Sequence, residues 1–582
     1  MSIFRLRLFL FLGGSILMLT YNLSFTIKEM TNTYKTISYM FLALLLICII
    51  ACNPTSHNKE DHSKNTLING ETIKKHLAEL SSDKYTGRMP CTEGETLTVD
   101  YLTSALKALK LQPGNGSSYT QDVPLLTIDG EISKHMEVNT PDGQLMWNKG
   151  QDFVIHTQRK ADAIGIENSE LVFCGYGIVD EKSGWNDYAG IDMKGKTAVV
   201  LVNDPGYGGD DPDFYKGDIM TYYGRWTYKY EEADRQGAAG LLIIHETSSA
   251  GYPWFVVQSS WQGPQQGLSG LDRSNDCGVK GWISLQKAQQ LFEKSGYNFT
   301  EEIKKARKPG FKPVPLKSTV TASLENSYKE CTSKNVIAID VGTKYPDEYI
   351  VYTAHWDHIG IGKVVEGDSI YNGALDNASG TAALLAIAEA YATSDNERSA
   401  MFLFVTAEEQ GLLGSEYYVK SPTVPLDKMV CNLNLDGVNP AGQMKDFTIT
   451  GKGHSTMDEY AEKHAKLQDR YVMAEQEPEK GYFFRSDHFN FAKSGVPALY
   501  GDGGYDHATK GKEYAQAFRD SFITQNYHAP SDEFDAATWQ MDGAIQDAQI
   551  YYNIGYDIAN SRDWPQWNSS SEFSRPDNFI KD

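Results

Sequence analysis

Two adjacent glutamates, Glu408 and Glu409, directly follow the apolar run at residues 400–405. Adjacent carboxylates repel each other, and on its own such a pair is typical of a solvated turn. At the end of a buried strand, the pair needs a partner that offsets its charge. That partner can be water, a bound cation or a proton.

Other side chains that bind metals or carry protons also stand where apolar runs stop. Residues 349–353 run into His355 and His358, and residues 429–435 run into Asp436. In an open α/β sheet, ligands bind outside the carboxyl ends of the strands, so these side chains should gather along one edge. Histidine together with carboxylate is the ligand set of a zinc site. The residue types leave open which of the two histidines binds.

Two further candidates lie in loops. Asp376 stands in "NGALDNASGT", a glycine-bounded loop before an expected helix, and His528 stands in "NYHAPSDEFD", close to Pro530. Taken singly, the aspartate could be a helix N-cap and the histidine an ordinary loop residue. The coincidence of these residue types at three strand ends and in two loops favours a metal site over separate structural roles.

The elements that must position these residues alternate between strand and helix from Asn335 onward. Examples are "DEYIVYTAH", "GTAALLAIAEAYA", "RSAMFLFVTAEE" and "KMVCNLNLDG". This alternation predicts an α/β fold, with a mostly parallel twisted sheet and helices on both faces. Residues 163–325 instead show short strands and glycine-rich turns, which predict a β-rich insert without metal ligands. Its one histidine at a strand end, His245, fits a structural role.

Length and charge narrow the class of protein. A chain of 582 residues exceeds one typical domain, so two or more are expected. The net charge of −22 argues against nucleic acid as a partner, because phosphate binding needs clustered Lys and Arg. The same sequence shows no repeat with a period of 20 to 50 residues, which argues against a solenoid or propeller.

The N-terminal region has the pattern of a bacterial lipoprotein signal. The apolar stretch from Met40 to Cys52 follows Lys35, with a possible start at Met30, and residues 49–52 resemble a lipobox. We expect cleavage before Cys52, acylation of its thiol, and anchoring to a bacterial membrane outside the cytoplasm. Which membrane and which face stay open. The polar stretch "NPTSHNKEDHSKN" that follows is typical of a flexible tether.

The cysteines suggest disulfides rather than a thiolate metal site. Their spacing contains no CxxC pair, which excludes zinc fingers of the thiolate type. Five cysteines are left once Cys48 is removed with the signal and Cys52 is acylated. One or two disulfides are possible among these five in an oxidising compartment, but the sequence does not pair them.

In its motifs the chain resembles the dinuclear-zinc exopeptidases grouped with aminopeptidase Y and glutamate carboxypeptidase. The matching motifs are "TAHWDH", "GALDNASG", "TAEEQGLLGS", "NLNLDG", "RSDHFNF" and "NYHAPSDEFD". The N-terminal "HLAELSSDKYTGR" and "SYTQDVPL" also match, and the insert is similar to a protease-associated domain. The resemblance covers about residues 71 to 560, and six motifs in the right order make it specific.

The resemblance implies a role for each candidate residue. It implies two zinc ions per chain, with these ligands: His355 and Asp436 on one ion, Glu409 and His528 on the other, and Asp376 bridging both. It selects His355 over His358 through the family's His-x-Asp pattern. The remaining roles would be Glu408 as general base, Asp357 orienting His355, Tyr527 donating a hydrogen bond to the tetrahedral intermediate, and Arg485 and Asp487 lining the substrate pocket.

The implied reaction is hydrolysis of the N-terminal bond of a peptide by a metal-activated water. Three alternatives stay open: a carboxypeptidase of the same fold, a glutaminyl cyclase with one zinc, and a non-catalytic receptor-like relative. The sequence does not reveal residue preference, native metal or oligomeric state. The expected organisation is a signal at 1–51, a tether at 52–70, peptidase segments at 71–162 and 326–565 around the insert at 163–325, and a tail at 566–582.

Overall fold

The computed structural model describes residues 3–12, 15–24, 67–133, 135–261, 263–576 and 579. The chain divides into two compact units, Met1–Asn65 and Thr66–Asp582. In the first unit, β1 (Ile3–Leu12) and β2 (Ser15–Ser24) form an antiparallel hairpin. The expected acylation site Cys52 and the greater part of the tether lie outside the described residues. No described helix has both the length and the apolar character needed to cross a membrane.

The main sheet of the second unit is mixed, with parallel strands in its middle. Its strand order is β15–β19–β16–β20–β23–β21–β22, and β19, β16, β20 and β23 run parallel to one another. The strands are β15 (Val314–Asp340), β16 (Tyr345–His355), β19 (Arg398–Val405), β20 (Met429–Asn434), β21 (Asp446–Thr450), β22 (Tyr471–Ala474) and β23 (Ala498–Asp502).

Strand β19 shows why the middle strands read as uninterrupted apolar runs. All eight of its residues are buried. Ala400, Phe402 and Phe404 pack into the larger hydrophobic core, whereas the residues that alternate with them pack into a smaller core on the opposite face. Because successive side chains of a strand point to opposite faces, a strand covered on both sides is apolar on both, as β19 is from Ala400 to Val405.

Helices cover both faces of this sheet. The larger core includes residues of α2 (Gly70–Leu80), α3 (Glu93–Ala108), α9 (Gly380–Tyr391), α11 (Met457–Leu467) and α14 (Met541–Ala559). The smaller core includes residues of α10 (Leu413–Lys420) and α12 (His488–Lys493). The α/β fold expected from the alternation of strands and helices is therefore confirmed. Helix α13 (Gly511–Gln525) is mostly at the surface, with Ala515 its one buried residue.

The insert has a sheet and a core of its own. Strands β8, β11, β12 and β14 are parallel neighbours in that order, and β7 pairs antiparallel with β14. Its strands are β5 (His135–Thr140), β6 (Gly143–Asn148), β7 (Phe153–His156), β8 (Ala163–Phe173), β9 (Val179–Asp180), β10 (Trp185–Asn186), β11 (Thr197–Leu201), β12 (Gly240–His245), β13 (Gln265–Leu268) and β14 (Val279–Ser284). Its helices are α4 (Trp226–Arg235), α5 (Thr247–Ala250), α6 (Trp254–Ser260), α7 (Leu285–Lys294) and α8 (Phe299–Ala306).

The core of the insert begins earlier in the chain than residue 163. Met136, Trp147 and Phe153 are completely buried and pack in the same core as residues of β11 and β12. Strands β5 to β7 thus belong with the insert by packing. In contrast, His245 has the structural role expected of it, because its Nε2 contacts the carbonyl of Tyr252 at 3.0 Å.

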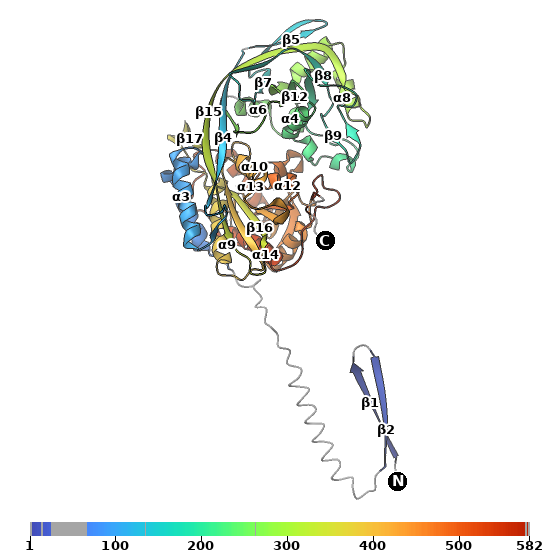
Figure 1. The fold of residues 1–582 in the computed structure, drawn as a ribbon, viewed down its shortest axis with the longest axis vertical. Helices are drawn as coiled ribbons and strands as arrows, with labels where there is room; N and C mark the ends of the chain where they lie inside the picture. The colour runs from blue at the N-terminus through green and yellow to red at the C-terminus, as the bar shows by residue number, and fades with distance from the viewer. Residues whose placement is uncertain are drawn as a thin grey trace. The chain divides into compact units, whose positions relative to one another are not determined.

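Two long strands connect the insert to the main sheet (Figure 1). Strand β4 (Thr120–Ile132) pairs antiparallel with β15 from Val336 to Leu324. The C-terminal end of β15 joins β19 in the main sheet, and its N-terminal part pairs with β8 and β5 in the insert. One continuous strand is therefore shared by both sheets.

The remaining elements are short. They are β3 (Gln112–Pro113), β17 (Gly360–Val365), β18 (Asp368–Tyr371), and the helical turns η1 (Asp83–Arg88), η2 (Phe214–Lys216), η3 (Tyr222–Gly224), η4 (Ala374–Ser379), η5 (Leu426–Lys428), η6 (Pro478–Lys480) and η7 (Tyr482–Phe484). In the expected C-terminal tail, Phe573 is buried, and Glu572 forms an ion pair with Lys216 of the insert at 2.7 Å.

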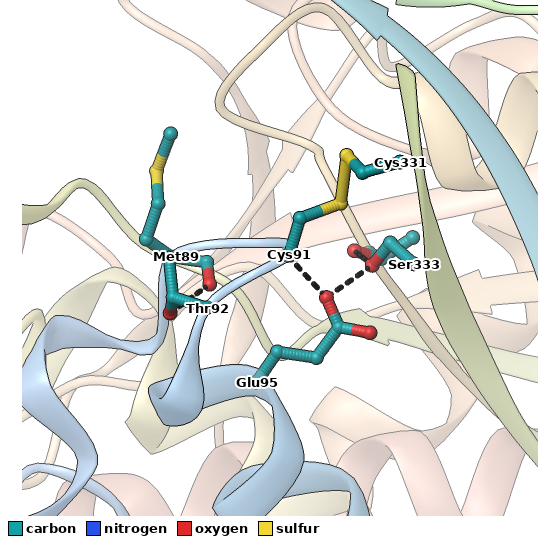
Figure 2. The surroundings of a disulfide bond; sticks show 7 residues. Met89, Cys91, Thr92, Glu95, Cys331 and Ser333 are labelled. Carbon is teal, nitrogen blue, oxygen red and sulfur yellow. Dashed lines mark hydrogen bonds between the residues drawn. A yellow bond between two sulfur atoms is a disulfide. The ribbon is translucent and has the colours of Figure 1, made fainter. Parts of the chain in front are cut away.

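A disulfide joins Cys91, between η1 and α3, to Cys331 of β15, with Cα atoms 6.2 Å apart. This settles the pairing that the sequence leaves open. Figure 2 shows Glu95 beside this bond, where it accepts hydrogen bonds from the Cys91 N–H and, at 2.9 Å, from the Ser333 hydroxyl. Ser333 in turn contacts the Thr406 hydroxyl at 2.6 Å. The disulfide thus ties the segment between η1 and α3 to β15, and the hydrogen bonds of Ser333 extend this connection to Thr406, which follows β19.

We expect the Cys91→Ser/Cys331→Ser double variant to lose about 2–5 kcal/mol of unfolding free energy, because the bond closes a long loop in the unfolded chain. The two cysteines are 240 residues apart. Urea unfolding followed by circular dichroism measures the loss. Dithiothreitol should lower the unfolding midpoint of the wild type and leave that of the double variant unchanged. Equal sensitivity of both proteins to the reductant would contradict the pairing.

Candidate active site

Three parallel strands bring the candidate residues to one edge of the main sheet. His355 ends β16 and lies opposite Val405, the last residue of β19, and Thr353 lies opposite Asn434, the last residue of β20. The residues that follow these strands are therefore neighbours, as the rule for open α/β sheets requires. The gathering of these residues at one edge is as expected from the sequence.

The first cluster forms around His355. Its Nε2 lies 3.1 Å from Oδ1 of Asp436 and 3.3 Å from Oδ1 of Asp376. His355 is 1% exposed, and both carboxylates are mostly buried. An imidazole nitrogen and two carboxylate oxygens thus converge on one point.

The second cluster forms around His528 and shares Asp376 with the first. Nε2 of His528 lies 3.2 Å from Oδ2 of Asp376 and 3.0 Å from Oε2 of Glu409. The two oxygens of Asp376 therefore face two different histidines. This is the position that a bridging carboxylate would hold, and it brings the five expected ligands together.

The donor atoms fit a cation in both clusters. Ligand atoms of His355, Glu408 and Asp436 all lie within 4.8 Å of one another, as do those of His358, Asp376 and Glu409. Distance alone therefore admits Glu408 and His358 as ligands as well. Although burial would lower the pKa of His528, Glu409 and Asp376 raise it to about 10. A bound metal cation would offset this concentration of negative charge.

The two adjacent glutamates differ in electrostatics. Burial raises the pKa of Glu408 well above its usual range, and the carboxylates of Asp436 and Glu409 add to the effect. Burial and Asp376 would also raise the pKa of Glu409, but His358 and His528 outweigh them and lower it to about 2. Neighbouring carboxyls whose pKa values are driven apart mark a division of roles. Glu408 is suited to carry a proton, and Glu409 is suited to remain an anionic ligand.

Asp357 contacts His355 differently from the expectation. Nδ1 of His355 lies 3.2 Å from the Asp357 carbonyl oxygen and 3.7 Å from its carboxylate. That carboxylate accepts the backbone N–H groups of Glu408 at 3.1 Å and Glu409 at 3.4 Å. Asp357 therefore holds the turn that carries both glutamates, which begins at Ala407 with a φ of 53°.

Three residues that support the expected ligands were not predicted from the sequence, and two of them contact Glu409 and Asp436. Nδ1 of His358 lies 2.6 Å from Oε1 of Glu409, which leaves Oε2 of Glu409 free to face His528. The Ser486 hydroxyl donates to Oδ2 of Asp436 at 2.6 Å. His358 and Ser486 both lie in motifs quoted above, next to residues that were assigned roles. Contacts of this kind fix the orientation of a metal ligand.

Asp532 is the third missed residue. Its carboxylate accepts the N–H of Leu375 at 2.9 Å and that of Asp376 at 3.1 Å. Since Asp532 lies four residues after His528, it couples the His528 loop to the loop of Asp376. Its place in "NYHAPSDEFD" was the available signal, but nothing in the sequence shows which backbone it reaches.

Tyr527 lies beside the second cluster. Its ring stacks on that of His528, with centroids 3.9 Å apart, and its side chain is about half exposed. Burial and the nearby carboxylates, Asp376 first among them, raise the pKa of Tyr527 well above its usual range. Its hydroxyl therefore stays protonated and can donate a hydrogen bond.

The two residues expected to line the pocket occupy different environments. Asp487 is completely buried, its Oδ1 accepts from the Ser415 hydroxyl at 2.5 Å, and burial raises its pKa to about 7. Its side chain therefore lies within the protein rather than on an open wall. Arg485 is close enough to Arg225 of the insert for the two charges to repel each other, and its Nη2 donates to the carbonyl of Lys480 at 2.5 Å. Their role in substrate binding stays a prediction.

Comparisons with known proteins find aminopeptidases among the similar sequences. Residues 335–553 match the model of Peptidase family M28. Leucine aminopeptidase 2 of Arthroderma otae is 30% identical over 236 residues, which are 38% of this chain and 44% of the relative. Aminopeptidase NAALADL1 of Mus musculus is 34% identical over 138 residues, which are 22% of this chain and 17% of the relative. The chain spans less than half the length of these relatives.

Solved structures with a similar shape include an aminopeptidase from Aneurinibacillus sp. strain AM-1, with 19% identity and a TM-score of 0.48 over 89% of this chain and all of that one. A zinc aminopeptidase from Bacillus subtilis has 18% identity and a TM-score of 0.41, over 88% of this chain and 99% of that one. The segment that matches the family model contains the five expected ligands together with Glu408 and Tyr527. The part of this chain that is similar to Peptidase family M28 is therefore the part that carries the candidate site.

Proposed function

We propose that this protein is a zinc-dependent exopeptidase that releases the N-terminal residue of peptide substrates. The observation that carries the proposal is the position of Asp376 between two histidine–carboxylate clusters, with Glu408 beside them. The family match supports peptide hydrolysis. Relatives named as aminopeptidases support the direction of cleavage.

The arrangement fits two zinc ions. His355 and Asp436 would hold one ion, Glu409 and His528 would hold the other, and Asp376 would be shared. Nitrogen and carboxylate oxygen are common zinc donors. When bound, zinc lowers the pKa of a water molecule and polarises the scissile carbonyl.

The protein's own groups would move the proton and stabilise the developing charge. A carboxylate oxygen of Glu408 accepts a proton from the attacking water, and later delivers it to the leaving amine nitrogen as the C–N bond breaks. Its raised pKa suits both steps. The Tyr527 hydroxyl donates a hydrogen bond to the oxyanion that forms on the carbonyl carbon.

A carboxypeptidase is the second candidate, because two arginines meet at the interface between insert and main domain. Arg225 precedes α4, and Arg485 is followed by Ser486, which contacts Asp436. Burial, and then repulsion by the Arg485 guanidinium, lower the pKa of Arg225 to about 9. The Nε atoms of both arginines are buried without a hydrogen-bond partner among the described residues. Two such cations favour a carboxylate, for instance the C-terminus of a peptide.

The signal pattern supports export, and so does the disulfide, because disulfides persist in oxidising compartments. We infer that the mature protein is anchored to a bacterial membrane, outside the cytoplasm, by a lipid on Cys52. The insert is proposed to be a protease-associated domain that shapes access to the site. Neither candidate metal cluster includes a residue of 163–325.

The two glutamates should respond differently to replacement by glutamine. In Glu409→Gln, zinc content and activity should fall together, because a neutral amide is a poorer ligand than a carboxylate. In Glu408→Gln, kcat should fall by about 10²–10⁴-fold while both zinc ions remain. Metal analysis of the purified proteins, together with hydrolysis of leucine p-nitroanilide, tests both expectations.

A competitive inhibitor should still bind Glu408→Gln, which serves as the control for an intact pocket. Loss of zinc from Glu408→Gln but not from Glu409→Gln would show that the roles are reversed. Full activity of both variants would place the reaction elsewhere in the protein.

Blocked tripeptides decide between the two directions of cleavage. An aminopeptidase should cleave a tripeptide with an amidated C-terminus and fail on its N-acetylated counterpart, because only the free amine is required. Mass spectrometry of the products measures this. Cleavage of the N-acetylated tripeptide but not of the amidated one would instead indicate a carboxypeptidase. Loss of that cleavage in Arg225→Met or Arg485→Met would establish it.

Lipid anchoring is tested in the intact bacterium. Cys52→Ser should leave the membrane fraction or accumulate with its signal still attached, because the thiol that carries the lipid is missing. Fractionation and mass spectrometry of the N-terminus measure both outcomes. A Cys52→Ser protein that fractionates like the wild type would contradict the lipobox assignment.

A further inference from the structure

A buried arginine outside the ligand set links the two loops that carry the expected metal ligands. Arg88 ends η1 and is 1% exposed. Its guanidinium donates to four backbone carbonyls: Nε to Trp356 at 2.8 Å, Nη1 to Leu80 at 2.8 Å and to Asn372 at 2.6 Å, and Nη2 to Gly373 at 2.8 Å. One side chain thus holds three separate segments.

The carbonyls that Arg88 binds flank the first and the bridging ligand. Trp356 directly follows His355, and Gly373 lies three residues before Asp376. The Arg88 carbonyl also accepts the N–H of His358 at 3.4 Å. The backbone around His355 is therefore held on both sides of Asp357, and the loop of Asp376 is held at its start.

Arginine suits this position for geometric reasons. Its planar fork presents five N–H donors at fixed angles, so that it can bind carbonyls on several segments at once. A lysine ammonium has three donors on a flexible stem and cannot reproduce this pattern. Burial lowers the pKa of Arg88 to about 10, and the carboxylates of Asp532, Asp357 and Asp376 oppose that effect. The guanidinium therefore stays charged at neutral pH and partly offsets the charge of the ligand cluster.

The segment around Arg88 is itself fixed in place. Gly87 has a φ of 70°, and a Cβ there would lie 2.6 Å from the carbonyl oxygens of Gly360 and Tyr371, so the turn packs directly on the β17–β18 hairpin. Three residues after Arg88, the disulfide from Cys91 anchors the chain to β15 (Figure 2). The segment that carries Arg88 is therefore held on both sides of this residue.

We propose that Arg88 is a positioning residue that sets the separation of the His355 and Asp376 loops, and through it the zinc affinity of the site. Among the described residues, its hydrogen-bond partners are all backbone carbonyls, so it acts through the ligands rather than on substrate. The inference rests on the proposed zinc-dependent function and deepens it.

The test compares Arg88→Lys with a matched buried arginine. Arg398 opens β19, at the end away from Glu408, and is 0% exposed. It donates to the carbonyls of Ile558 and Asp563 and also pairs with the carboxylate of Glu348 at 2.7 Å. Zinc dissociation constants are measured by competition with a chelating dye. Arg88→Lys should bind zinc about 10- to 100-fold more weakly than the wild type, as is usual for residues that orient ligands. Arg398→Lys should lose stability to urea while keeping the zinc affinity of the wild type.

Chemical rescue separates positioning from general stability. Methylguanidinium added to Arg88→Ala should restore zinc affinity and kcat together, because the ion can occupy the vacated site and bind the same carbonyls. It should not change the zinc affinity of Arg398→Ala. Circular dichroism in the metal-free state shows whether each variant is folded.

Equal zinc affinity in Arg88→Lys and Arg398→Lys would overturn the proposal. So would failure of both Arg88 variants to fold with zinc and methylguanidinium present, which would leave Arg88 a purely structural role. A wild-type protein that binds no zinc would instead refute the proposed function. The two failures are therefore distinguishable.

Discussion

Mutual repulsion of buried carboxylates constrains the candidate site and the segments that hold it. Asp376, Glu408, Glu409 and Asp436 converge at one sheet edge, where solvent cannot screen them as it would at a surface. Cations must offset this charge, and rigid segments must hold the carboxylates against it. The raised pKa of Glu408 and the lowered pKa of Glu409 are two responses to the same field. One neighbour takes up a proton readily, whereas the other stays ionised beside two imidazoles.

The scaffold supports three of the expected metal ligands separately. Ser486 holds Asp436, His358 holds Glu409, and the carboxylate of Asp532 holds the backbone of Asp376. Asp357 acts on the turn of the paired glutamates through their N–H groups rather than mainly on its histidine. Arg88 adds a tie between loops that come from different strands. These supports matter because a shift of a ligand oxygen by a fraction of an ångström changes how well a metal ion is held.

Segments far apart in the chain build the site and its surroundings. The N-terminal helix α2 and the C-terminal helix α14 pack in the core that carries β16 and β19. Strand β15 continues from the main sheet into the insert, so the insert is attached by backbone hydrogen bonds as well as by side chains. Glu572 near the C-terminus pairs with Lys216 of the insert. The position of the insert is thus set by contacts at several points rather than by a single linker.

The sequence by itself determined the α/β class and the identity of the residues that meet. Apolar runs at strand spacing, each ending on histidine or carboxylate, specify parallel strands whose ends share an edge, which accounts for the fold class and for the candidates at strand ends. The choice of His355 over His358, and the ligand roles of Asp376 and His528, came from the family resemblance. The roles of Asp532, His358 and Arg88 could not be read in this way. Apart from Leu80, which Arg88 binds from eight residues away, the partners that define these roles are backbone groups or side chains between 51 and 285 residues away. The disulfide pairing was undecided for the same reason, and the insert was expected to start at residue 163, later in the chain than its core begins. Only the tertiary structure decides such contacts, since hydrogen-bond partners distant in sequence leave no periodic signal in the chain.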